Sequence, residues 1–193
     1  MRLYVLVRHG QSELNATHRI NGDPDVPVRL TAQGEEEARA LGMQIAHLEL
    51  ELCVHTRFGR TRQTAELALE GRAVPVLVEP LLDDIEIGEL EGRTIDDYRA
   101  WKDEHVRSDP FPGGESLDDA ALRYADAFER LLDRDEPRVL IVCHEIPVRY
   151  ALNAAAGSDD LDGPAHQIGN CIPHLFDEAG LRRAAQAIRR LVG

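Results

Sequence analysis

The feature that most constrains the fold is a set of short apolar runs with no polar residue at alternate positions. Residues 3–7 read LYVLV and residues 139–143 read VLIVC. Runs of this length that are rich in Val and Ile are typical of strands buried on both faces of a sheet. Residues 51–56 and 74–78 have a similar character. Strands buried on both faces belong to a mostly parallel sheet, so we predict helices on either side of it.

Helical patterns fill the intervals between these runs. In residues 31–48, Thr31 is a candidate N-cap and apolar residues recur with helical spacing. Ser116 and Asp119 form a capping-box pattern at the start of a second long helix. Strands that alternate with helices predict an α/β fold, a three-layer α/β/α sandwich with a mostly parallel central sheet. We expect one domain spanning residues 1–193.

Two segments depart from the regular alternation. Residues 84–116 mix Gly, Pro and acidic residues around one short helical stretch, and we expect them to form a lid-like cover over a pocket. In this lid, Trp101 and Phe111 are expected to form a small hydrophobic cluster rather than to stack on a substrate. Residues 171–176 contain Pro173, which cannot donate a hydrogen bond to a neighbouring strand, so we expect this strand at an edge of the sheet.

The charge balance limits the classes of partner. The chain has 22 Lys and Arg against 35 Asp and Glu, a formal net charge of -13. Without a Lys/Arg cluster, this balance argues against nucleic acid and anionic membranes as partners. No apolar stretch is long enough to cross a bilayer, and no signal-peptide pattern opens the chain. The three cysteines are an odd count that fits buried, reduced thiols, so we expect a cytoplasmic protein.

Polar residues follow the predicted strands at their carboxyl ends. Arg8 and His9 follow the first strand, and His144 follows residues 139–143. Ligands of open α/β sheets bind outside this edge, so we expect these side chains to converge there. Histidines with arginine neighbours and without metal-ligand spacing favour an anion site over a metal site. A histidine beside bound phosphate can attack phosphorus, and Gly10 would let the backbone approach that phosphate closely.

Segments along nearly the whole chain resemble, in order, the motifs of the histidine phosphatase superfamily, in its phosphoglycerate mutase-like branch. They are LVRHGQSELN at 6–15, RLTAQGEEEARALG at 29–42, TRFGRTRQTAE at 56–66, LLDDIEIGELEG at 81–92, FPGGES at 111–116 and VLIVCHE at 139–145. One such segment is weak evidence, but several in the right order are strong. The resemblance implies the phosphoglycerate mutase-like α/β fold.

The resemblance also implies a role for each matching residue. His9 is the expected nucleophile that becomes phosphohistidine. Arg8, Arg60 and His144 are expected to hold the phosphoryl group, and Asn15 to donate a hydrogen bond to one of its oxygens. The acidic segment is expected to supply the proton donor to the leaving oxygen. Because the arginines and His144 supply the positive charge, the resemblance implies neither a metal nor another cofactor.

Three departures from the family pattern affect the expected site. The alignment places Asp84 where the family usually has Glu, and the shorter side chain leaves Glu86 as an alternative proton donor, since it would face the same side in an extended segment. Residues 55–58 read HTRF where the family usually has Ser-Ser-Pro-Leu, so Arg57 and His55 either add charge near the pocket or point away from it. Glu145 follows the second histidine and would repel a phosphate unless it faces away, so it is a candidate for restricting substrate choice.

The sequence therefore predicts a phosphomonoester hydrolase that acts on a small phosphorylated metabolite through phosphohistidine. The first alternative is a phosphoglycerate mutase, which uses the same covalent chemistry, although 193 residues are few for such an enzyme. A non-catalytic binding protein on the same fold and a metal-dependent hydrolase are further alternatives. The pattern leaves open the physiological substrate and the choice between a monomer and a homodimer.

Overall fold

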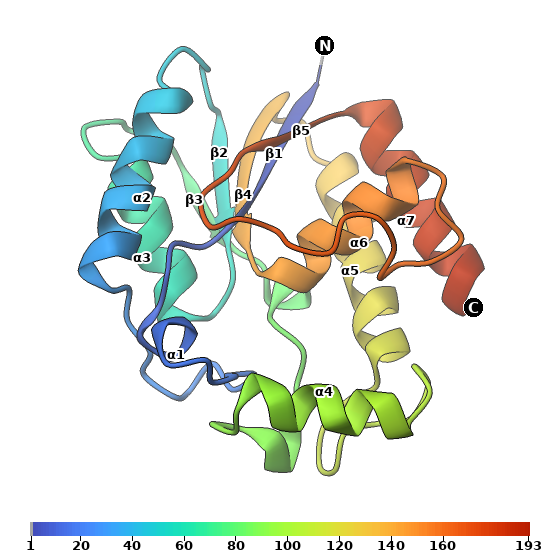
Figure 1. Cartoon of the computed structure of the whole chain (residues 1–193). Coiled ribbons are helices and arrows are strands. Elements are labelled where there is room, and N and C mark those ends of the chain that lie inside the picture. Colours follow the sequence, from blue (N-terminus) through green and yellow to red (C-terminus); the bar gives the residue numbers. More distant parts are fainter. Residues whose placement is uncertain (1) are drawn as a thin grey trace.

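The computed structural model describes residues 2–193, in which five strands form one sheet in the order β3-β2-β4-β1-β5 (Figure 1). The strands are β1 (Leu3–Arg8), β2 (Leu52–His55), β3 (Val76–Val78), β4 (Arg138–Cys143) and β5 (His174–Asp177). The strands β1 to β4 pair in parallel, and β5 pairs with β1 in antiparallel orientation. The prediction of a mostly parallel sheet is therefore confirmed.

Helices cover both faces of this sheet, as predicted (Figure 1). On one face lie α2 (Ala32–Gln44) and α3 (Gly59–Ala68), and on the other lie α5 (Leu117–Leu132), α6 (Glu145–Ala155) and α7 (Glu178–Val192). Successive side chains of β1 enter different cores, because Val5 and Val7 pack with the first pair of helices while Tyr4 and Leu6 pack with the other three. Strand β1 is thus buried on both faces, which explains its continuous apolar run.

The predicted helix starts are confirmed. Thr31 caps α2 by accepting a hydrogen bond from the Gly34 backbone N–H. Ser116 and Asp119 form a complete capping box at the start of α5, in which each side chain accepts from the other residue's backbone N–H. Strand β5 begins directly after Pro173 and lies at an edge of the sheet, as expected.

The expected lid-like segment contains the 3₁₀ turn η2 (Gly88–Leu90) and the helix α4 (Ile95–Glu104), and it follows the turn η1 (Pro80–Leu82). Helix α4 lies beyond the carboxyl ends of the parallel strands, beside the short helix α1 (Glu13–Ala16) (Figure 1). Trp101 packs against Phe111, with ring centroids 4.1 Å apart and ring planes tilted by 33°, and Phe111 is buried. The expected hydrophobic cluster is therefore present. No helix within residues 2–193 combines the length and the apolar character that crossing a membrane requires.

Two glycines let the turn after β1 pack against the start of α2. A Cβ atom added to Gly10 would lie 2.4 Å from the Gly34 carbonyl oxygen, and one added to Gly34 would lie 2.1 Å from the Gln11 carbonyl oxygen. Both distances are far shorter than a carbon and an oxygen tolerate without bonding, and backbone atoms cannot move aside easily. The approach between the turn and the helix therefore requires glycine on both sides.

We predict that Gly34→Ala lowers the free energy of unfolding by about 1–3 kcal/mol, because the added methyl group forces this backbone contact apart. Gly59→Ala is the control, since its Cβ would meet only the Val28 carbonyl oxygen at 3.4 Å, an ordinary contact, and alanine favours a helix more than glycine does. Denaturant unfolding of the three proteins checks this. Equal stability of the Gly34 variant and the wild type would contradict the predicted clash.

Candidate active site

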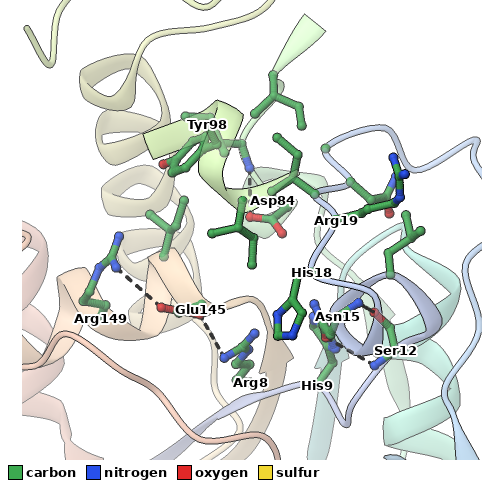
Figure 2. A pocket seen from close by; sticks show the side chains of 18 of the residues that line it. Arg8, His9, Ser12, Asn15, His18, Arg19, Asp84, Tyr98, Glu145 and Arg149 are labelled. Carbon is green, nitrogen blue, oxygen red and sulfur yellow. Dashed lines mark hydrogen bonds and ion pairs between the residues drawn. The ribbon is translucent and has the colours of Figure 1, made fainter. Parts of the chain in front are cut away.

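A cavity of about 700 Å³ opens at the carboxyl edge of the sheet. It is lined from four directions: by the turn after β1 together with α1, by the segment before η2, by α4, and by the start of α6 with the loop after it. Figure 2 shows the labelled side chains of this lining, with Arg8 and His9 at one end, Tyr98 at the other and Asp84 between them. The polar residues expected to converge at this edge do so.

His9 lies almost fully buried at the base of the cavity, with a defined hydrogen bond on each ring nitrogen. Its Nδ1 lies 2.7 Å from the Gly10 carbonyl oxygen, which can only accept, so Nδ1 carries the proton. Its Nε2 lies 3.0 Å from Arg60 Nε–H, which donates, so Nε2 presents a lone pair. Burial and the charges of Arg60 and Arg8 hold the pKa of His9 well below its usual value of 6.5. The imidazole is therefore neutral and nucleophilic at Nε2.

Arg60 connects the other polar groups of the site. It lies in the first turn of α3 and is 3% exposed. One terminal nitrogen donates both to Asp84 Oδ2 at 3.0 Å and to His144 Nδ1 at 3.2 Å, and the other donates to the side-chain oxygen of Asn21. The guanidinium carbon lies 4.2 Å from the centre of the Phe58 ring, a cation–π contact. These contacts fix the guanidinium beside His9.

His144 is the N-cap residue of α6 and is fully buried. Because Arg60 donates to its Nδ1, its Nε2 carries the proton and donates to Thr56 Oγ1 at 2.9 Å. Thr56 Oγ1 in turn lies 2.9 Å from Thr61 Oγ1, which donates to the Phe58 carbonyl oxygen. This chain of hydrogen bonds orients the imidazole. Burial and the charge of Arg60 hold the pKa of His144 well below 6.5.

Asp84 lies beside Arg60 and His144 and lines the cavity. Its Oδ2 lies 3.4 Å from His144 Nδ1, and its side chain is 22% exposed. Desolvation raises the pKa of this carboxyl above its usual 3.8, and the charge of Arg60 opposes that shift only in part. A bound phosphate dianion would raise it further, because a like charge disfavours ionisation. Asp84 is therefore suited to hold a proton.

Arg8 and Asn15 complete the lining near His9. Asn15 accepts a hydrogen bond from the Ser12 backbone N–H as part of the capping box of α1. Its carboxamide oxygen is thereby occupied, and within residues 2–193 its NH₂ group makes no hydrogen bond to the protein. That group can donate to an anion in the cavity. Arg8 ends β1 and extends along the wall formed by α6 (Figure 2).

Two sequence candidates lie elsewhere. Glu86 is exposed and does not line this cavity, because the chain does not continue as an extended strand but enters the turn η2; instead it borders a second cavity of about 470 Å³. Arg57 also borders that second cavity, 55% exposed, with its Nε 2.5 Å from Asp83 Oδ2. Of the two carboxylates considered as proton donors, only Asp84 contacts Arg60 and His144.

Sequence reasoning missed several residues that complete the site. Buried Asn21 accepts from Arg60, and its own NH₂ group donates to Glu91 Oε1 at 2.7 Å. His18 has a left-handed backbone conformation, with φ of 54°, and lines the cavity beside Arg19. The motif NGDPD at residues 21–25 has the composition of a turn, so nothing in the sequence indicates that Asn21 contacts Arg60. Only the close approach of this turn to α3 reveals it.

Residues 2–193 contain no group of three or more His, Cys, Asp or Glu side chains placed to hold a metal ion. The positive charge that favours an anion comes from Arg60 and from Arg8, which also contacts Glu145. A proton on Asp84 removes a negative charge from the same site. The arrangement can therefore bind a phosphoryl group, attack it from His9 Nε2 and donate a proton from Asp84.

Comparison with known proteins gives one family. The family model of the histidine phosphatase superfamily (branch 1) matches residues 4–191. The chain is similar to a protein of Photorhabdus laumondii named "Probable phosphoglycerate mutase GpmB", with 36% identity over 171 residues that cover 83% of this chain and 75% of that relative.

Solved structures give the same fold. The alpha-ribazole phosphatase of Shigella flexneri superposes with a TM-score of 0.79 at 24% identity, covering 91% of this chain and 90% of that one. A mycobacterial glucosyl-3-phosphoglycerate phosphatase superposes with a TM-score of 0.74 at 22% identity, covering 91% and 92%. At these identities the likeness concerns the fold alone, and it agrees with the three-layer architecture.

We predict that His9 titrates well below pH 6.5 and has its proton on Nδ1 when neutral, because burial and two arginines disfavour the imidazolium. Arg8→Gln removes one of these positive charges, so the pKa of His9 should move up, toward 6.5. Long-range ¹H–¹⁵N NMR of the histidine rings over a pH series measures both quantities. A wild-type His9 that titrates at or above 6.5 would contradict the electrostatic argument.

Proposed function

The chain belongs to the histidine phosphatase superfamily (branch 1), and we propose that it is a phosphomonoester hydrolase that works through a phosphohistidine on His9. The proposal rests on two neighbouring groups, His9 and Asp84, that contact the same guanidinium and favour opposite protonation states. His9 is neutral and has a lone pair on Nε2 that accepts only from Arg60, and Asp84 has a raised pKa. A nucleophile without its proton and an acid with its proton are what the first step of ester cleavage needs.

In the first step, His9 Nε2 attacks phosphorus and the bond from phosphorus to the ester oxygen breaks. Asp84 transfers its proton to that oxygen, so the alcohol leaves as a neutral molecule. Arg60, now released from His9 Nε2, donates to the phosphoryl oxygens together with Asn15, and this stabilises the charge spread over them. His144 joins them as a donor when the bound dianion raises its pKa and Nδ1 takes up a proton. The phosphate takes the place of internal hydrogen bonds, so the guanidinium needs little reorganisation.

In the second step, water attacks the phosphorus of phosphohistidine and the nitrogen–phosphorus bond breaks. Asp84, ionised by the first step, accepts the proton of the attacking water. The partial exposure of Asp84 supports this step, because solvent can reach its carboxylate. The shifted pKa values widen the pH range in which both groups have the required forms, since protonation of His9 limits the rate in acid and ionisation of Asp84 limits it in base.

A phosphoglycerate mutase is the second candidate, and the name of the Photorhabdus laumondii relative favours it. Both reactions form the same phosphohistidine. They differ in whether water or the hydroxyl group of a bound phosphoglycerate receives the phosphoryl group. The names of the Shigella flexneri and mycobacterial structures, both phosphatases, favour hydrolysis. We rank hydrolysis first because of the solvent access to Asp84.

We predict that the wild type releases phosphate from 4-nitrophenyl phosphate in the presence of a chelator, and that His9→Ala is slower by about 10³-fold or more, because no other group can form the covalent intermediate. The matched control is His47→Ala, which removes an exposed histidine that does not line the cavity. Phosphate release is the measurement. Conversion of 3-phosphoglycerate to its 2-isomer with a bisphosphoglycerate primer, without net phosphate release, would replace the hydrolase by the mutase.

We predict that Asp84→Asn slows hydrolysis of alkyl phosphates by about 10²–10⁴-fold, because their leaving oxygen needs a proton. For 4-nitrophenyl phosphate the decrease should be much smaller, since nitrophenolate leaves without one. Glu86→Gln serves as the matched control and should change neither substrate's rate by more than about twofold. The kcat values for both substrates check this. Equal losses for the two substrates in the Asp84 variant would contradict a role as proton donor.

A further inference from the structure

Glu145 is a carboxylate in the wall of a cavity built to bind an anion. It is the first residue of α6 and follows His144 directly. Its Oε2 lies 2.9 Å from a terminal nitrogen of Arg8, and its Oε1 lies 3.5 Å from a terminal nitrogen of Arg149. Figure 2 shows the three side chains in a row along one wall, joined by dashed lines. The side chain of Glu145 is 31% exposed.

The protein itself thus pairs the cations on this wall. The Arg8 nitrogen that meets Glu145 also donates to the Ile168 carbonyl oxygen at 2.7 Å. The second terminal nitrogen of Arg149 lies 2.8 Å from Asp162. A carboxylate therefore counters the charge of each arginine before any ligand enters, while the buried Nε of each makes no hydrogen bond within residues 2–193. This differs from Arg60, whose contact to His9 Nε2 must be surrendered when a phosphoryl group arrives.

The rest of the cavity offers a different environment for the body of a substrate. Beyond the phosphate end, the lining contains apolar side chains from three segments of the chain. They are Ile20, Ile85, Ile87, Ile95 and Tyr98. Such a surface favours an alcohol with an apolar face, and a cavity of about 700 Å³ exceeds what a three-carbon phosphate needs.

We propose that Glu145 is a specificity-determining residue, which makes the site select phosphomonoesters of uncharged alcohols over those with a carboxylate close to the phosphate. The inference rests on the proposed hydrolase function and adds the substrate class. A substrate carboxylate on this wall meets the like charge of Glu145 and finds Arg8 and Arg149 already paired. Like charges at such distances disfavour binding. A substrate hydroxyl group can instead donate a hydrogen bond to Glu145.

The opposite substrate preference, for a carboxylate beside the phosphate, would require a different position of the Glu145 side chain. If Glu145 swung away, Arg8 and Arg149 would both become available, and a carboxylate beside the phosphate would bind well. The two possibilities make opposite predictions for one pair of compounds. Glycerol 3-phosphate and 3-phosphoglycerate have the same three-carbon chain and differ only in a hydroxymethyl group against a carboxylate.

The test is the ratio of kcat/KM for glycerol 3-phosphate over 3-phosphoglycerate, in the wild type and in Glu145→Gln. Glutamine keeps the shape of the side chain and removes its charge. We expect a ratio of roughly tenfold or more in the wild type, and a decrease of about tenfold in the variant, because the repulsion is lost. A general effect of the substitution on catalysis cancels in the ratio. For compounds that turn over slowly, inhibition constants against 4-nitrophenyl phosphate compare their binding, on which the repulsion by Glu145 also acts.

Asp103→Asn is the matched control, because Asp103 is an exposed carboxylate that lines the same cavity without pairing to Arg8 or Arg149. Its ratio should stay within about twofold of the wild type, since an exposed charge is screened by solvent. A similar decrease in both variants would overturn the assignment to Glu145. A wild type that prefers 3-phosphoglycerate, or a ratio unchanged in Glu145→Gln, would overturn it as well.

Failure of the hydrolase proposal can be distinguished from failure of the Glu145 proposal. If none of the three phosphate esters releases phosphate, hydrolysis is excluded while the assignment of Glu145 stays open to measurement. Dissociation constants of the two three-carbon compounds, measured by calorimetry with the wild type and Glu145→Gln, then give the selectivity in binding. The expected and contradicting results are the same as for kcat/KM.

Discussion

The site depends on one buried guanidinium. An arginine with only 3% of its surface exposed is tolerated because its donors are satisfied, and Arg60 donates to His9, His144, Asp84 and both the side chain and the backbone of Asn21. The planar fork of donors dictates where these partners stand relative to one another. An ammonium group would supply the charge without that geometry. Removal of Arg60 would therefore disperse the nucleophile and the acid as well as weaken phosphate binding.

The parallel sheet supplies the proximity that Arg60 then organises. Arg8 and Cys143 are partners in the register of β1 and β4, so the residues that follow them, His9 and His144, leave the sheet side by side. The backbone N–H of His9 still donates to the Cys143 carbonyl oxygen at 3.0 Å. Two histidines separated by most of the chain thus approach to 5.4 Å between ring centres. The glycine contact between the turn after β1 and α2 holds this end of the strand in place.

The electrostatics of the cavity differ between its base and its wall. The protein has a formal net charge of -13, so an anion approaches against the average field. At the base, burial and the charge of Arg60 keep both histidines neutral, and Arg60 keeps its own charge among polar partners. On the wall, Glu145 and Asp162 neutralise the arginines. A phosphoryl group is attracted at one end of the cavity, while a second anion beside α6 meets Arg8 and Arg149, which already pair with carboxylates.

By itself the sequence determined the features that depend on interactions between residues close together in the chain. Continuous apolar runs predicted strands buried on both faces, and capping residues such as Thr31 predicted where helices begin, because both follow from neighbouring residues. Motif order also singled out the residues that line the cavity base. Only the tertiary structure decided that Glu86 and Arg57 face a second cavity, that Asn21 holds Arg60, and that Glu145 pairs with arginines. These outcomes depend on how loops far apart in the chain fold over the sheet edge, and spacing along a sequence contains no record of such distances.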